Sequence, residues 1–503
     1  MTPNGLNASP KTCGTLTLSF AAALLIAAGG LAHPAHAEAT QAPGASTPAG
    51  VEAAASEAMA TDPAAKADTK AAAPARPAPK NDAPSKDGGA LTWHGITLYG
   101  TFDIAVAHLS HGAPLTSYYG PGLPFVIQKN ANRPITSISP NGLSQSKIGV
   151  SGAERINDDA KLVFKLETGF QPTSGHLSNG SKSLVIDNGR PLTDQVTNGD
   201  SSRAGQLFQG AAWIGVASKT YGTLTYGLQN SLFLDNFARY DPQNSSQSFS
   251  VLGYSGFAPG GGATETARLP SAVKYAFAKG PVRVSALHNF QGAANFVGHA
   301  DQVNLGGDYE GLSVDVTWSH VASATSESPL SAAQNAIHPG TLAATISDNT
   351  AYGVEAKYVW GKAKFYGGFE HIEMANPKHP LPASFRGIGG YDVDFVNNAA
   401  YTIHRVEKVS WAGVRYSVND KLDLVGAYYR YDQNSFKGNG CSDASASSCS
   451  GQLQDFSAVA DYRLTRRFDV YGGVNHSEVA NGLAAGFLQT RSTAPVVGVR
   501  FNF

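Results

Sequence analysis

From about residue 95 to the end of the chain, apolar and polar side chains alternate along segments of nine to fifteen residues. In the first segment, Ile104 and Val106 share one face and Thr101 and Asp103 share the other. A period of two places such sets on opposite sides of a β-strand. The pattern therefore predicts an antiparallel sheet with one apolar face and one polar face.

The alternation recurs in sixteen segments: 95–109, 144–156, 160–171, 207–217, 222–230, 270–278, 281–290, 301–310, 311–320, 349–360, 363–373, 408–418, 421–431, 453–464, 467–477 and 495–503. An even number of antiparallel strands is what a closed bacterial outer-membrane barrel with both chain ends in the periplasm requires. The apolar faces would then contact lipid rather than form the core of a sandwich.

The connections between these segments fall into two length classes. Tight turns are predicted at 157–159, 219–221, 279–280, 310–311, 361–362, 419–420 and 465–466. Long connections alternate with them at 110–143, 172–206, 231–269, 291–300, 321–348, 374–407, 432–452 and 478–494. This sorting favours an all-β, 16-stranded antiparallel transmembrane β-barrel with short periplasmic turns and long extracellular loops. A lumen of that width exceeds what side chains can fill, so the polar inner faces are expected to line water.

The N-terminal residues carry the marks of export. Lys11 precedes an apolar stretch over 16–31, and Ala35-His36-Ala37 places small residues where a signal peptidase cleaves. We therefore expect a signal peptide over 1–37, an Ala- and Pro-rich disordered periplasmic segment over 38–91, and a barrel over 92–503. An alternative for the middle segment is a tether that touches the cell wall.

Composition narrows the class of protein further. The chain has 55 Gly, 23 Phe and 20 Tyr, a mean hydropathy of −0.18 and a formal charge of −1. After the N-terminus no apolar run reaches the ~20 residues of a membrane helix, and a charge near zero does not favour a nucleic-acid partner. After cleavage of the signal peptide two cysteines remain, Cys441 and Cys449, which we expect to form a disulfide in the oxidising periplasm or outside the cell.

The sequence shows no set of residues typical of an enzyme. A nucleophile with an adjacent base, a phosphate loop and a paired-cysteine metal motif are all absent from it. Glu370-His371-Ile372-Glu373 could suggest a metal site, but it ends a predicted strand at the rim, where charged side chains are usually solvated. We therefore expect neither catalysis nor a cofactor.

Several segments together resemble the general trimeric porins of Gram-negative bacteria, of the β-proteobacterial type. The resemblance covers about 92–503 and rests on Leu98-Tyr99-Gly100 with Asp103, on 146–154, on 164–170, on 221–227 and on the terminal Phe503. It implies a homotrimer in the outer membrane that lets small hydrophilic solutes and ions diffuse passively. It also implies insertion by the barrel-assembly machinery, with Phe503 as the recognition signal, and a third long loop folded into the lumen as a constriction.

The chain departs from the family pattern along the pore wall. Gly210 and Leu228 stand where the family usually has arginines, while Lys147 keeps a positive charge in place of an arginine. Ser271-Ala272 replaces an Asn-Ser pair. With two expected arginines missing, we predict weak ion selectivity.

The constriction is predicted to combine charges of the third loop with charges of the facing wall. The loop candidates are Asp235, Arg239, Asp241, Glu265 and Arg268; the wall candidates, inward by alternation, are Lys147, Lys165 and Glu167. An outward loop is the alternative. Two other functions stay open: a substrate-selective channel, whose conductance one solute would saturate, and an adhesin or structural surface barrel, which would conduct little or not at all.

Overall fold

The computed structural model describes residues 91–118, 125–197, 203–252, 268–290, 298–436 and 446–503. The expected signal peptide and nearly all of the segment 38–91 lie outside this part of the chain, so both remain predictions.

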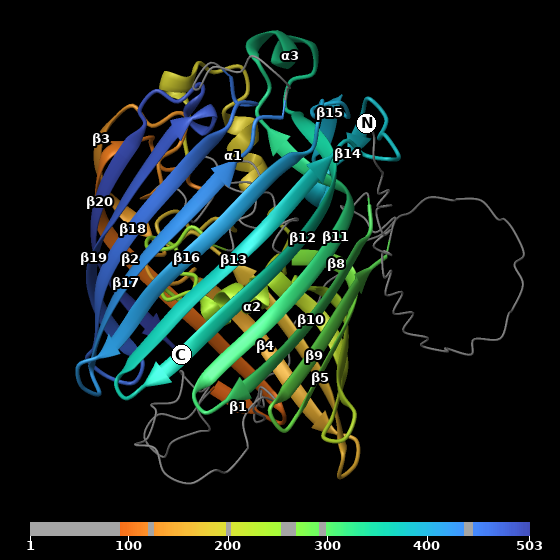
Figure 1. Ribbon diagram of the computed structural model, residues 1–503, viewed down its shortest axis with the longest axis vertical. Coiled ribbons are helices and arrows are strands. Elements are labelled where there is room, and N and C mark those ends of the chain that lie inside the picture. The colour runs from red at the N-terminus through yellow and green to blue at the C-terminus, as the bar shows by residue number, and fades with distance from the viewer. Residues whose placement is uncertain (1–90, 119–124, 198–202, 253–267, 291–297, 437–445) are drawn as a thin grey trace, which may run out of the picture. The chain divides into compact units, whose positions relative to one another are not determined.

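Within the described residues, one sheet closes on itself as a barrel with sixteen wall positions (Figure 1). The wall consists of β2 (Ile96–Gly112), β3 (Arg133–Pro140) with β4 (Lys147–Arg155), β5 (Ala160–Gly169), β6 (Ala211–Ser218), β7 (Gly222–Asn230), β8 (Arg268–Lys279), β9 (Val282–Asn289), β10 (Ala300–Tyr309), β11 (Leu312–Ser328), β12 (Leu342–Trp360), β13 (Ala363–Ala375), β16 (Arg405–Ser417), β17 (Leu422–Gln433), β18 (Gly451–Arg463), β19 (Phe468–Asn481) and β20 (Arg491–Asn502). β3 and β4 share one position because both pair with β2. Wall neighbours are antiparallel, and β20 closes the barrel by pairing with β2.

Each of the sixteen predicted segments overlaps one wall position, and the predicted faces are confirmed. On β10, Val303 and Leu305 are about half exposed on the outside, whereas Gln302 and Asn304 point inward and are buried. Period-two alternation thus gives an apolar face toward lipid and a polar face toward the lumen.

Short turns connect the strands at one end of the barrel. Gly280 and Gly361 have φ angles of 58° and 56°, in the left-handed region that side chains with a Cβ rarely adopt. These two glycines explain why the chain reverses within two residues at the predicted positions.

At the other end, the long connections contain more regular structure than predicted. The predicted loop 110–143 includes β3, and β11 and β12 extend into the predicted loop 321–348. The smaller elements are β1 (Leu91–Trp93), β14 (Phe385–Arg386), β15 (Asp392–Asn397), α1 (Gly180–Ile186), α2 (Leu232–Tyr240), α3 (Ala332–Ile337), η2 (Leu192–Asp194), η3 (Ile388–Gly390) and η4 (Gly482–Ala484). β15 pairs with β12 in parallel and so widens the sheet above the rim. None of the helices in the described ranges is both long and apolar enough to cross a bilayer.

Candidate functional site: the barrel lumen

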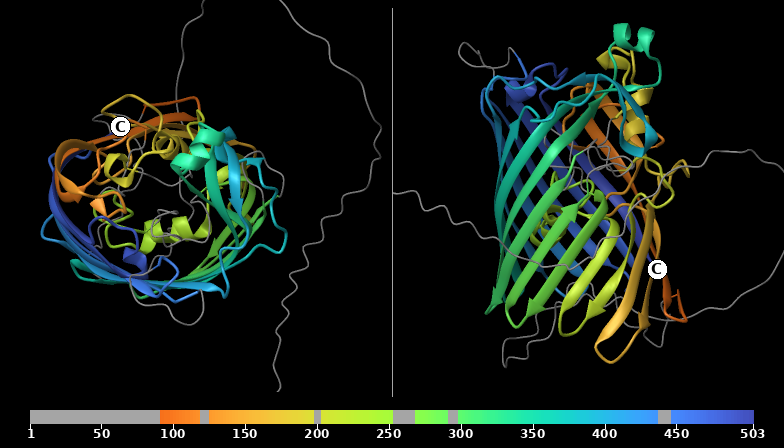
Figure 2. Two further views of the ribbon diagram at one scale, coloured as in Figure 1. Left: turned by 90° about the horizontal axis from the view of Figure 1, so that it is seen from above. Right: turned by 90° about the vertical axis from the view of Figure 1, so that its right-hand side faces the viewer.

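Helix α2 lies inside the barrel at the start of the third long loop, L3 (residues 231–267; Figure 2). Ser231 caps its first turn through a 3.1 Å hydrogen bond from the backbone N–H three residues later. Asp235 in the first turn and Arg239 in the last turn complement the helix dipole. Phe233 and Phe237 are fully buried, and the helix contacts β9 to β13. The inward position expected for the start of L3 is therefore observed.

Polar side chains of β17 and β18 bind the chain after α2 to the wall next to the strands that α2 contacts. The Tyr429 hydroxyl donates to Asp241 (2.6 Å), and the Tyr431 hydroxyl donates to the carbonyl oxygen of Val251 (3.2 Å). Ser457 accepts a hydrogen bond from a glutamine side chain of L3 (2.9 Å). Asp241 is fully buried. It therefore anchors L3, rather than presenting a charge to the water as predicted.

The first long loop, L1 (residues 113–132), also enters the lumen, which the sequence did not predict. Phe125 and Ile127 are fully buried. The Ile127 N–H donates to the hydroxyl of Ser477 (2.8 Å), and the Asn475 amide donates to the carbonyl oxygen of Phe125 (3.2 Å). Both partners lie on the inner face of β19, so L1 packs against this wall from inside.

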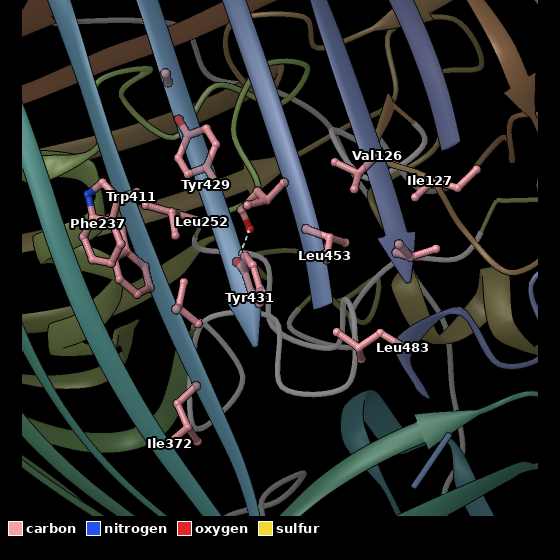
Figure 3. Close-up of a cluster of buried hydrophobic side chains, with 14 of the residues drawn as sticks. Val126, Ile127, Phe237, Leu252, Ile372, Trp411, Tyr429, Tyr431, Leu453 and Leu483 are labelled. Atoms are coloured by element: carbon pink, nitrogen blue, oxygen red, sulfur yellow. Dashed lines mark hydrogen bonds between the residues drawn. The ribbon is translucent and has the colours of Figure 1, made fainter. Parts of the chain in front are cut away.

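Apolar side chains from the wall and from both loops form a core within the lumen (Figure 3). Its members include Val126, Ile127, Phe233, Phe237, Leu252, Ile372, Trp411, Tyr429, Tyr431, Leu453 and Leu483. The expectation that the inner faces line water is therefore wrong for the part of the wall that this core covers. Here the loops supply apolar partners, and burial stabilises the pairing by roughly 25 cal/mol per Å² of apolar surface.

On the wall formed by β4 and β5, the three predicted wall residues meet, because two lysines converge on the Glu167 carboxylate. The ammonium groups of Lys147 and Lys165 each lie 3.2 Å from the same oxygen of Glu167, and the Tyr99 hydroxyl donates to it at 3.1 Å. The Glu167 side chain is 6% exposed, whereas the lysine side chains are 34% and 33% exposed. The two lysines therefore contact water inside the barrel, as the alternation predicted.

Arg203 belongs to this cluster but was missed at the sequence level. It lies in the second long loop, L2 (residues 170–210), donates to Gln209, and lies so close to Gly210 that a Cβ there would be 3.0 Å from its guanidinium. Arg268 donates to the carbonyl oxygen of Gly210 (2.9 Å). Both arginines act electrostatically on Glu167. Arg203 thus supplies a positive charge beside the position where the family's arginine is missing.

The remaining charges of α2 pair with the wall on its own side. Asp235 forms an ion pair with Lys274, and Arg239 lies 3.3 Å from Asp308. Glu265 lies outside the described residues. α2 therefore carries one acid and one base toward the lumen, each already matched by an opposite charge.

Each of the loops L1, L2 and L3 contains an ionisable group with an altered pKa. Burial raises the pKa of Asp241, and it raises the pKa of Asp187 in L2 to about 6. Burial lowers the pKa of Lys129 in L1, and the neighbouring charge of Arg405 lowers it further. These shifts show that L1, L2 and L3 each place a charged group in surroundings less polar than bulk water.

The two other groups of predicted residues lie at the rim and at the chain end. The Phe503 backbone forms two hydrogen bonds with Gly100 (3.0 and 3.1 Å), and a Cβ at Gly100 would collide with its ring. Cys449 is buried and disulfide-bonded. Cys441 lies outside the described residues, so the pairing of these two cysteines stays a prediction, as does the role of Phe503 in assembly.

In the described ranges, no group of three or more His, Cys, Asp or Glu side chains is arranged to hold a metal ion. In the segment considered as a metal motif, Glu370 points inward and is buried, whereas His371 and Glu373 lie on the other face of β13. The strand period therefore separates the possible ligands.

The closed wall, the apolar outer face and the charged loops inside define an outer-membrane β-barrel of the channel-forming class. Comparisons with known proteins agree. The sequence profile of Gram-negative porins matches residues 21–482. The chain belongs to the Gram-negative porin family, whose location is the outer membrane, and this membership indicates a channel rather than an enzyme.

Individual relatives are distant. An outer membrane porin protein of Bordetella pertussis is 26% identical over 188 residues, which cover 37% of this chain and 40% of that protein. Among solved structures, an anion-selective porin from Comamonas acidovorans has a TM-score of 0.52 at 15% identity, and covers 81% of this chain and 99% of its own. A loop-deletion mutant of OmpT from Vibrio cholerae has a TM-score of 0.51 at 13% identity, with the same coverage. The two structures show that the fold is shared.

Proposed function

We propose that the protein forms a water-filled channel for the passive diffusion of small hydrophilic solutes and ions. The observation that carries this proposal is the position of Lys147 and Lys165, which stay about one-third exposed inside a closed barrel. A lysine that faces water there marks the wall of an aqueous passage. The channel carries out no covalent chemistry. Family membership supports a homotrimer, inserted by the barrel-assembly machinery and surrounded by outer-membrane lipid.

L3 narrows this passage and charges on both sides set its ion preference. α2 and the chain after it occupy one side of the lumen, and the cluster around Glu167 occupies the wall of β4 and β5. Low-dielectric walls strengthen the field of each charge in the water between them. Because the charges of α2 are each matched by an opposite charge and two of the family's pore-wall arginines are missing, we propose weak selectivity.

Planar-bilayer recording of the purified protein tests this proposal. Removal of residues 240–262 is expected to raise single-channel conductance, because it takes the anchored part of L3 out of the lumen. Lys147→Glu is expected to shift the reversal potential in a KCl gradient toward cation preference. Lys408→Glu is the matched control, since Lys408 is exposed on the outer face of β16 and should leave the reversal potential unchanged.

Each outcome decides between functions. Unchanged conductance and reversal potential in both lumen variants would mean that L3 and Lys147 do not line the passage. Conductance that one solute saturates would identify a substrate-selective channel instead. A protein that inserts without conducting would be a surface adhesin or structural barrel.

A further inference from the structure

An acidic stripe runs along the inner wall opposite the Glu167 cluster. Glu355 on β12, Glu370 on β13, Glu407 on β16 and Asp455 on β18 all point inward, and each is completely buried. Their strands are neighbours in the sheet, separated only by β17. Glu407 is already paired with Arg405 on its own strand (3.0 Å), so without a cover Glu355, Glu370 and Asp455 would be the carboxylates that attract cations to this wall.

L3 covers one end of this stripe. The Asn236 amide on α2 donates to Glu355 at 3.4 Å, and the Phe233 ring lies over Gly353 next to it. Further along, the hydroxyl of Tyr431 is held by the carbonyl oxygen of Val251. The Tyr431 side chain lies within electrostatic range of the stripe. The cover is therefore in direct contact with the acidic wall.

L1 covers the other end. The Asn475 side chain bridges the two, since it donates both to the carbonyl oxygen of Phe125 in L1 (3.2 Å) and to Asp455 (2.8 Å). Val126 and Ile127 extend the same cover toward Leu453 in the apolar core. Asp455 is thus linked to L1 through Asn475.

L1 also carries a positively charged residue, Lys129. Lys129, two residues beyond the buried Ile127, keeps part of its surface exposed, although the protein around its ammonium group lowers its pKa. The charged group that acts on it is another cation, Arg405, on the inner face of β16. Where the bare wall would present carboxylates, the folded loop therefore presents an ammonium group.

We propose that L1 is a second pore-lining loop, which together with L3 shields the acidic stripe from the passage and presents Lys129 in its place. L1 thereby shifts the ion preference of the channel toward anions. This inference rests on the proposed function as a channel. It assigns to L1 a selectivity role that is separate from the narrowing of the passage by L3.

The first test is a pair of lysine variants recorded in planar bilayers under a KCl gradient. Lys129→Gln should lower the anion-to-cation permeability ratio by roughly twofold, the effect of one charge about 8 Å from a permeating ion in water. Lys378→Gln is the matched control, because Lys378 is exposed in the sixth long loop and its backbone N–H, which the change keeps, makes its hydrogen bond. Equal ratios for the two variants would overturn the proposal.

The second test examines the shield. Asp455→Asn should leave the permeability ratio unchanged in the full chain, because L1 covers this side chain. In a variant whose residues 114–131 are replaced by a short glycine-containing turn, the anion-to-cation permeability ratio should fall. Adding Asp455→Asn to that variant should raise the ratio again. An equal effect of Asp455→Asn with and without L1 would overturn the shield.

The two tests separate the inference from the function on which it rests. Conductance with unaltered selectivity in all variants refutes the role of L1 while the channel stands. A wild-type protein that does not conduct refutes the channel itself. If the shortened L1 prevents assembly, the lysine pair decides alone, because both changes keep the backbone hydrogen bonds of these residues (Leu488 N–H to Lys129, 3.0 Å; Lys378 N–H to Asp348, 2.9 Å).

Discussion

The anchor between Tyr429 and Asp241 should control how firmly L3 stays in the lumen. Tyr429→Phe removes the 2.6 Å hydrogen bond to Asp241 and leaves the carboxylate with the backbone N–H groups of Gln243 (3.0 Å) and Ser245 (2.7 Å). The loss of one hydrogen bond to a buried charged group costs about 2 kcal/mol. At 1.4 kcal/mol per factor of ten, the displaced form of L3 should become about 30 times more populated.

Hydrogen exchange measures this opening directly. Several backbone N–H groups after α2 are hydrogen-bonded. The N–H of Asn244 donates to the carbonyl oxygen of Asp241 (3.0 Å), and the N–H of Ser248 donates to the carbonyl oxygen of Gly142 (2.8 Å). Peptides over residues 241–252 should therefore exchange about 30 times faster in Tyr429→Phe. Single-channel records should show more frequent transitions to a higher conductance level.

Tyr428→Phe is the control for this experiment. Tyr428 is the preceding residue on the same strand, its ring points outward, and its hydroxyl donates to Gln454 at 3.3 Å. Tyr428→Phe should change neither the hydrogen exchange of residues 241–252 nor the frequency of transitions to the higher conductance level. If the amides of residues 241–252 exchange at the same rate in both variants, the Tyr429 hydroxyl does not hold L3 in place. The apolar core alone then fixes the loop.

Three further predictions concern other parts of the chain. Deletion of Phe503, whose backbone pairs with Gly100, should severely lower outer-membrane yield while export continues; fractionation with immunoblotting measures both, and normal yield would refute a role in assembly. Cys441 and Cys449 should be disulfide-bonded in protein isolated from the outer membrane, so mass spectrometry that finds two free thiols would contradict the pairing. Burial raises the pKa of Asp187 to about 6, above its unfolded value of about 4, so its contribution to stability is full below about pH 4 and is lost as pH rises through about 6. Thermal unfolding should therefore show a stability advantage at pH 5 over pH 7.5 that Asp187→Asn reduces, and an undiminished difference would refute this cause.

The wall could be predicted because lipid and lumen impose a period of two on every strand. The segments 301–310 and 349–360, for example, match β10 and the lower part of β12 almost residue by residue. Where the strands rise above the membrane this constraint ends. The extension of β11 to Ser328 and the pairing of β15 with β12 were therefore missed.

The interior was harder to predict because loops carry no period. The inward course of L3 came from family resemblance, and the place of Asp241 depended on Tyr429, far away in the sequence. L1 offered one local signal, the run of three large apolar residues Phe125-Val126-Ile127 in a connection otherwise broken by Gly, Pro and polar residues. Such a run in a loop indicates a buried partner surface. Arg203 offered no signal, since its role depends on its closeness to Gly210 in space.

The apolar core inside the lumen gives this membrane protein a second folding problem, of the kind that soluble domains face. Its wall contributes Trp411, Tyr429 and Leu453, while L1 and L3 contribute Ile127 and Phe237. These groups lie inside the barrel, away from lipid, so their association should carry the heat-capacity change of hydrophobic burial. The strength of this association should not depend on bilayer thickness. We therefore expect the core to melt separately from the strands, which remain in lipid.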